Sequence, residues 1–312
     1  METLINGLHH VTTLAGDTQR NVDYYTDILG LRLVKKTVNF DAPDVYHLYY
    51  GNETGSPGTI LTFFPYGNLP RGRKGVGQLT YTAFSVAVNS LRFWMDRLHE
   101  RNISYAGPYK RFDESYLRFD DFDGMGIELV FTNDDSRTGW SNGHIPVEFA
   151  VRGFHTVTLN QQNPDRTIQL LTENLQHTLV GEEEGRFRFK AGIGGSGNYV
   201  DVLHSPNDVR ALQGAGSVHH VAFSTNSDET QLLIQQQLTE SGYQVTPVQD
   251  RNYFNSIYFR EPGGILFEVA TNPPGFTVDE PISDLGKSLK LPAQYESRRA
   301  KIETELPEIM LK

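Results

Sequence analysis

Hydrophobic positions along the 312-residue chain follow two periods in turn, and this pattern recurs four times. Short runs rich in β-branched and aromatic residues predict strands. Each is followed by a stretch in which apolar residues lie three or four positions apart, which predicts a helix. The strand-like runs are Gly7–Thr12, Gln78–Ala83, Gly153–Thr158 and Ser217–Ala222. Because the first and last are near-copies, we predict four copies of one unit.

The ends of the predicted helices carry the residues that helix termini prefer. In the first copy, Asp17 precedes Val22, Tyr25 and Leu29, and Gly30 follows them. An acidic cap, an apolar stripe and a terminal glycine together predict a helix with both ends defined. The helices of the other copies are predicted to begin near Asn89, Asn163 and Ser227.

Further strand-like runs follow each helix. In the first copy they are Leu33–Phe40, Tyr46–Tyr50 and Ile60–Phe64, and in the last Gln244–Val248, Ser256–Arg260 and Ile265–Thr271. One such small sheet cannot bury both faces, whereas two can curve around a cavity. We therefore predict an α+β fold of four βαβββ modules paired into two barrel-like domains. The predicted divisions are residues 1–132 and 153–272, followed by a peripheral tail, 273–312.

Composition excludes several classes of protein. The 28 basic against 38 acidic residues give a net charge of −10, which argues against a general binder of nucleic acid or anionic membranes. The chain has no cysteine, so disulfide scaffolds, thiol nucleophiles and iron–sulfur clusters are excluded. It shows neither a targeting signal nor an apolar run long enough for a membrane span. We expect no membrane partner and a cytoplasmic location.

Four of the ten histidines form two doublets at equivalent places in the repeat, His9–His10 and His219–His220. Neighbouring side chains on a strand point to opposite faces, so each doublet presents one imidazole to the predicted cavity. The pattern alone does not distinguish the first histidine of a doublet from the second.

Glu268 lies within an apolar run of the last predicted strand. A buried carboxylate is costly unless it is paired or bound to a metal. One alternative is an ion pair with an arginine such as Arg251 or Arg260. The other is a metal site made by Glu268 and one histidine of each doublet. Two neutral imidazoles and one carboxylate form the facial triad favoured by non-haem Fe(II), with open positions for substrate and oxygen.

The other copies serve as internal controls. The third copy has His155 at the place of His9 but Thr156 at the place of His10. The second has Glu128 at the place of Glu268 but no histidine, and residue counting puts Phe63 there in the first. Only the first and fourth modules supply a full set. We therefore predict a metal site between them and an inert second cavity.

The motifs together resemble the vicinal oxygen chelate superfamily, which includes glyoxalases and extradiol dioxygenases. Within it, the chain is most similar to bacterial ring-cleaving dioxygenases of the hydroquinone type. The resemblance covers nearly the whole chain. It rests on Leu8–Thr12, Tyr46–Tyr49, Gly72–Gly75, Arg152–His155, His219–Phe223 and Pro262–Glu268.

The resemblance implies that the second histidine of each doublet binds the metal. The implied ligands are His10, His220 and Glu268, and the implied metal is Fe(II), with Mn(II) as an alternative. Polar groups implied around the open face are His9, Thr12, His219, Arg251 and Tyr258. From the residues alone, Arg251 could equally be a solvated loop charge and Tyr258 a core aromatic. The implied substrates are a hydroquinone or catechol and dioxygen, in a homo-oligomeric enzyme.

Two other functions fit the same pattern. A glyoxalase-type isomerase or lyase uses its metal as a Lewis acid and usually has four protein ligands. An apolar residue at the Phe63 position removes the fourth ligand, which favours oxygen chemistry. A protein that only sequesters small aromatics needs no open metal site, so the triad argues against that function.

Overall fold

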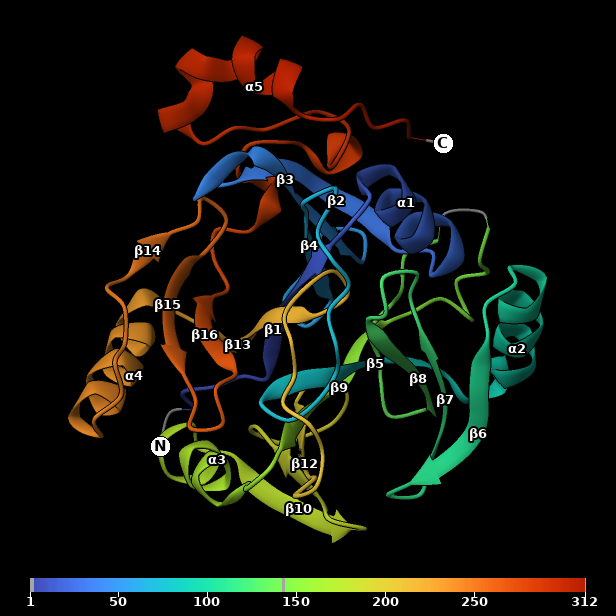
Figure 1. Cartoon of the computed structure of the whole chain (residues 1–312), viewed down its shortest axis with the longest axis vertical. Coiled ribbons are helices and arrows are strands. Elements are labelled where there is room, and N and C mark those ends of the chain that lie inside the picture. Colours follow the sequence, from blue (N-terminus) through green and yellow to red (C-terminus); the bar gives the residue numbers. More distant parts are fainter. Residues whose placement is uncertain (1–2, 142–143, 312) are drawn as a thin grey trace.

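The computed structural model describes residues 3–141 and 144–311. These residues form two strongly curved sheets of eight strands each, with helices on their outer sides (Figure 1). The predicted α+β fold of βαβββ modules is confirmed. None of the described helices has the length and apolar character needed to span a bilayer.

Each module runs strand, helix, three strands. The first contains β1 (Leu8–Ala15), α1 (Thr18–Asp23) with a π-helical turn η1 (Tyr24–Ile28), β2 (Arg32–Asn39), β3 (Ala42–Gly51) and β4 (Ile60–Pro65). The second contains β5 (Gln78–Ala87), η2 (Val88–Ser90), α2 (Leu91–Glu100), β6 (Tyr105–Arg111), β7 (Glu114–Asp120) and β8 (Gly126–Thr132).

The third and fourth modules follow the same order. The third contains β9 (Gly153–Gln161), α3 (Asp165–Gln169), η3 (Leu170–Asn174), β10 (Thr178–Glu183), β11 (Arg186–Lys190) and β12 (Tyr199–His204). The fourth contains β13 (Val218–Thr225), α4 (Asp228–Glu240), β14 (Gln249–Asp250), β15 (Asn255–Arg260) and β16 (Leu266–Thr271). The tail adds short turns η4 (Phe276–Val278), η5 (Ile282–Asp284) and η6 (Ala293–Arg298), and helix α5 (Arg299–Glu305).

The two sheets combine modules that are not all adjacent in sequence. One has the strand order β14-β15-β16-β13-β1-β4-β3-β2, and so joins the fourth module to the first. The other has the order β10-β11-β12-β9-β5-β8-β7-β6, and joins the third module to the second. Each sheet is therefore built from both the 1–132 and the 153–272 segments. In each sheet the first strands of two modules pair antiparallel at the centre, β1 with β13 and β5 with β9.

The predicted caps are present at the starts of α1 and α4, whereas α2 and α3 begin without a side-chain cap. Asp17 accepts a hydrogen bond of 2.7 Å from the backbone N–H of Arg20, and Ser227 accepts one from Thr230. Such bonds satisfy N–H groups that the first turn leaves without a partner. The predicted strand at Gln244–Val248 is wrong. β14 is a two-residue strand at Gln249–Asp250, because the preceding segment lies at an open edge and includes Pro247, which has no N–H to donate.

The C-terminal segment packs against the outer side of β2 and β3 (Figure 1). Lys35 of β2 is fully buried beneath it, and its ammonium group contacts the carboxylates of Asp279, at 2.5 Å, and Glu280. Near the end of the chain, Tyr295 donates a hydrogen bond to the carbonyl of Phe40, at the tip of the β2–β3 hairpin. The tail, which the sequence predicted to be peripheral, is therefore an integral part of the first sheet's packing.

We expect Lys35→Met to lower the free energy of unfolding by about 3 kcal/mol, because it leaves the buried Glu280 carboxylate without its main counter-charge. Denaturant unfolding measures this change. Lys287→Met is a matched control, because Lys287 pairs with Asp284 on the exposed surface of the same tail. It should cost about 0.5 kcal/mol or less. Equal effects of the two substitutions would contradict a stabilising role for the buried contact.

Candidate metal centre

The register of three central strands brings His10, His220 and Glu268 together. Antiparallel pairing of β1 with β13 sets Thr12 opposite His220, and parallel pairing of β13 with β16 sets Ala222 opposite Glu268. The Nε2 atoms of the two histidines lie 3.2 Å apart. Oε2 of Glu268 lies 3.2 Å from Nε2 of His10 and 3.0 Å from Nε2 of His220. Three potential ligand atoms thus converge on one point.

This arrangement fits a divalent metal. All three side chains are buried, and Oε2 of Glu268 has no well-formed hydrogen bond among the described residues. Neighbouring ligands about 2.1 Å from an octahedral ion lie about 3.0 Å apart, whereas a tetrahedral ion separates them by about 3.4 Å. The observed separations of 3.0–3.2 Å lie between these two values, so the three atoms could together bind one ion as one face of its coordination shell. Such a face leaves further coordination positions open.

The first histidine of each doublet provides a partner for the second. Nδ1 of His9 lies 2.9 Å from Nδ1 of His10, and Nδ1 of His219 lies 2.8 Å from Nδ1 of His220. A histidine that binds a metal through Nε2 carries its proton on Nδ1 and needs an acceptor there. His9 and His219 can accept a hydrogen bond from that N–H only when they are neutral, with an unprotonated Nδ1. The doublets therefore orient their own ligand imidazoles.

The ionisation of the surrounding groups agrees with these roles. Burial, together with the neighbouring His10, lowers the pKa of His9 to about 3. Burial and His220 likewise lower the pKa of His219 to about 3. Burial alone would raise the pKa of Glu268, but His10 and His220 hold it well below its usual value. The site therefore offers neutral acceptors and an ionised carboxylate at neutral pH.

A cavity of about 410 Å³ opens onto His10 and His220. Three of the polar residues implied by the resemblance line it, namely His219, Arg251 and Tyr258. His9 and Thr12 are buried and are not among its lining residues. The remaining lining residues are Asn39, Phe40, Asp41, His47, Tyr49, Phe64, Tyr66, Thr246, Gln249, Phe254 and Leu266.

Arg251 and Tyr258 form one polar unit in the cavity wall. The guanidinium group donates hydrogen bonds to Tyr258 Oη at 3.1 Å and to Gln249 Oε1 at 2.6 Å. It lies 3.9 Å from the carboxylate of Asp41, at the tip of the β2–β3 hairpin. Burial and the nearby Glu268 raise the pKa of Tyr258, so its phenol remains protonated. The unit presents one cation and one hydroxyl beside the triad.

Sequence reasoning did not assign a role to His47, Tyr49 or Thr62. His47 and Tyr49 line the cavity, and Nδ1 of His47 lies 2.8 Å from Tyr49 Oη. Thr62, rather than Phe63, occupies the position in the first module that Glu268 occupies in the fourth, because it pairs with Thr12 as Glu268 pairs with Ala222. Phe63 points into the core. Aligning the repeats by strand register instead of residue count would have found this position.

The second sheet fills its equivalent positions with ion pairs. Glu128 and Asp201 correspond in register to Glu268 and Thr62. Arg111 and Arg118 donate to Glu128 at 3.0 and 2.7 Å, and Arg188 donates to Asp201 at 2.8 Å. These cations satisfy the buried carboxylates, so no metal is needed to offset their charge.

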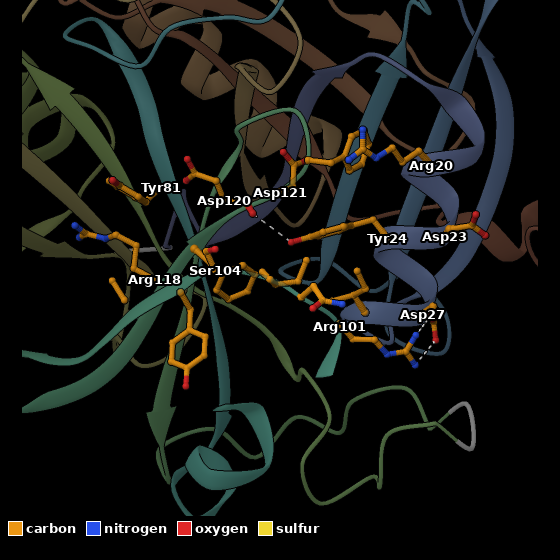
Figure 2. A pocket seen from close by; sticks show the side chains of 17 residues that line it. Arg20, Asp23, Tyr24, Asp27, Tyr81, Arg101, Ser104, Arg118, Asp120 and Asp121 are labelled. Carbon is orange, nitrogen blue, oxygen red and sulfur yellow. Dashed lines mark hydrogen bonds and ion pairs between the residues drawn. The ribbon is translucent and has the colours of Figure 1, made fainter. Parts of the chain in front are cut away.

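A second, larger depression of about 940 Å³ lies between the first two modules (Figure 2). Its charged side chains are partly satisfied by one another, as in the ion pair between Arg101 and Asp27. Asp121 accepts hydrogen bonds from Tyr25 and from the backbone of its own turn. Among the described residues, the triad is the one group of three or more histidine, aspartate or glutamate side chains whose ligand atoms lie close enough together to hold a metal. The chemistry therefore centres on the smaller cavity.

A family model, described as the glyoxalase/bleomycin resistance protein/dioxygenase superfamily, matches residues 7–129 and 153–269. The Bacillus subtilis protein MhqO, named as a candidate ring-cleaving dioxygenase, is 45% identical over 96% of this chain and 95% of its own length. A Sphingobium indicum protein named chlorohydroquinone/hydroquinone 1,2-dioxygenase is 36% identical over 94% of this chain and 93% of its own.

Solved structures agree with these matches. A crystal structure described as a candidate dioxygenase from Bacillus subtilis superposes with a TM-score of 0.96 at 44% identity, covering 100% of this chain and 99% of that one. Glyoxalase I from Zea mays covers 85% of this chain and 92% of its own, with a TM-score of 0.64 at 14% identity. The latter similarity concerns the fold alone.

We expect His220→Ala and Glu268→Ala to weaken Fe(II) or Mn(II) binding by at least about 100-fold, because each removes a ligand, and loss of an outer partner alone costs about 10- to 100-fold. Anaerobic metal titration measures the affinity. His155→Ala is the control, because His155 contacts Glu114 in the second sheet. Equal metal content in all three variants would exclude this site.

The lowered pKa values of His9 and His219 predict that the protein is less stable in acid. A histidine with a pKa of about 3 in the folded state and 6.5 when unfolded favours folding above pH 6.5, and this contribution is lost as pH falls towards 3. His219→Gln should reduce the pH dependence of the unfolding free energy by about 1.4 kcal/mol per pH unit within that window. Denaturant unfolding at several pH values tests this, and an unchanged slope would show that the folded protein does not hold His219 in its neutral form.

Proposed function

Since this chain belongs to the glyoxalase/bleomycin resistance protein/dioxygenase superfamily, we propose that it is a ring-cleaving dioxygenase that acts on a hydroquinone or catechol. The observation that carries the proposal is a buried His10–His220–Glu268 triad open to a cavity. Three protein ligands on one face leave room for both an aromatic diol and dioxygen. The names of relatives that match nearly the full chain support the same reaction class.

The cavity walls suit a planar aromatic ring with polar substituents. Phe40, Phe64 and Phe254 supply apolar contact, while Arg251 and Tyr258 supply hydrogen-bond donors. A ring held between aromatic side chains excludes water from its faces, which strengthens polar interactions at its edge. We infer that the substrate lies with one hydroxyl towards the triad and its ring among the phenylalanines.

The metal we propose is Fe(II), with Mn(II) as the alternative, held by His10, His220 and Glu268. When bound, it would lower the pKa of a phenolic hydroxyl and provide a binding position for dioxygen. Arg251 stabilises negative charge that develops on substrate oxygen atoms. His219, which stays neutral, and Tyr258, which stays protonated, line the cavity beside the triad and can form hydrogen bonds with the substrate hydroxyl groups.

The alternative of a glyoxalase-type isomerase is disfavoured by the residue at the fourth ligand position. That position holds Thr62, whose hydroxyl donates to Thr12 Oγ1 at 2.9 Å and lies 2.8 Å from Nε2 of His47. A neutral hydroxyl engaged by two partners is a poor substitute for a carboxylate ligand. A non-catalytic binder would not require the open triad. A homo-oligomeric assembly and a cytoplasmic location stay predictions from sequence.

The test is oxygen consumption by the Fe(II)-loaded protein with a panel of dihydroxybenzenes. We expect uptake of one dioxygen per diol and loss of the aromatic absorbance for at least one member. Glu268→Ala should abolish uptake, whereas His155→Ala should retain it. Stoichiometric binding of a diol without oxygen loss would overturn the dioxygenase proposal in favour of sequestration.

A further inference from the structure

A chain of hydrogen bonds runs from the cavity wall into the first module. Tyr49 Oη lies 2.8 Å from Nδ1 of His47, and Nε2 of His47 lies 2.8 Å from Oγ1 of Thr62. Thr62 donates in turn to Thr12 Oγ1 at 2.9 Å. Tyr49 is only 2% exposed, and both Thr62 and Thr12 are fully buried. The ring cleavage proposed above assigns no role to this series of hydrogen bonds.

The direction of the chain can be read from its buried end. The Thr62 hydroxyl donates its single hydrogen to Thr12 Oγ1. The Thr62 oxygen can therefore only accept from His47, so His47 carries a proton on Nε2. Burial and the nearby His10 and His220 lower the pKa of His47 well below its usual value, so the ring is neutral. Nδ1 of His47 is then an acceptor, and Tyr49 donates its proton to it. Tyr49 Oη is thereby left with accepting capacity on the cavity side.

Strand register makes Tyr49 the counterpart of Tyr258. Tyr49 lies opposite Thr62 on β3 and β4, as Tyr258 lies opposite Glu268 on β15 and β16. Both phenols line the cavity. Burial is the main cause that raises the pKa of Tyr49, and the nearby Tyr258 adds to it. The two tyrosines differ in their partners, because Tyr258 accepts from the Arg251 cation whereas Tyr49 donates to His47.

We propose that Tyr49 accepts a hydrogen bond from the substrate hydroxyl that stays protonated, and that His47 is the positioning residue that holds Tyr49 as an acceptor. The inference rests on the proposed function, since it concerns the diol bound at the triad. It adds a criterion for the substrate class: a phenol with a second hydrogen-bond donor on the ring. A site built to pair with a hydroxyl rejects the analogue that lacks it, because its own polar group is left unpaired.

The experiment compares anaerobic binding of each diol with that of the fluorophenol in which fluorine replaces one hydroxyl. The matched pairs are hydroquinone with 4-fluorophenol and catechol with 2-fluorophenol, titrated calorimetrically into the Fe(II)-loaded protein. The wild type should bind one diol about tenfold more tightly than its fluorinated partner. Tyr49→Phe should reduce that ratio to about one by weakening diol binding alone, and His47→Gln should reduce it in part.

Tyr46→Phe is the control, because Tyr46 lies on the same strand but donates to the carbonyl of Pro307 in the tail. It should leave both the ratio and the iron content unchanged. General damage to the site would weaken both members of a pair and preserve their ratio. A wild type without preference for either diol, or a Tyr49→Phe variant that keeps the full preference, would overturn the inference. Oxygen is absent throughout, so failure of ring cleavage is detected separately, in the uptake assay.

Discussion

The convergence of His10, His220 and Glu268 depends on the pairing of β1 with β13 at the centre of the first sheet. The two strands are about 210 residues apart in the chain, yet their register brings His10 and His220 to a separation of 3.2 Å between Nε2 atoms. Because side chains alternate between faces, a slip of one residue would turn His10 and His220 away from each other and from Glu268. Pairing of β13 with β16 then adds Glu268 to the same point. The metal centre is therefore as well defined as the sheet itself.

The two sheets compensate their buried carboxylates in different ways. A carboxylate in the middle of a buried sheet has to be compensated. In the first sheet Glu268 faces two imidazoles and accepts from the Ser256 hydroxyl, which leaves one oxygen available for a cation. In the second sheet arginine side chains surround Glu128 and Asp201. One architecture thus supports a site open to ligands in one half and a closed ionic core in the other.

The cavity is shaped by segments distant from the triad in sequence. The tip of the β2–β3 hairpin contributes Phe40 and Asp41, and the tail holds this tip through Tyr295. The fourth module contributes Arg251 and Tyr258, and the first contributes His47 and Tyr49. The fourth module therefore contributes a cation and a phenol to the cavity, whereas the first contributes a neutral, hydrogen-bonded histidine and tyrosine.

The repeat, the helix caps and most strands could be predicted from the sequence, because each depends on local periodicity and local hydrogen bonding. The candidate ligands could be narrowed to two doublets and one buried carboxylate for the same reason, since burial of a charge is visible in an apolar run. Residue counting nevertheless misassigned Phe63, and no local pattern identified the chain through His47 and Tyr49. The candidate ligands already indicated that the first and fourth modules meet. The tertiary structure decided how their strands pair, and that Thr62 takes the fourth position. Those outcomes are set by the register between strands far apart in the chain, and register is a property of the assembled sheet rather than of any one segment.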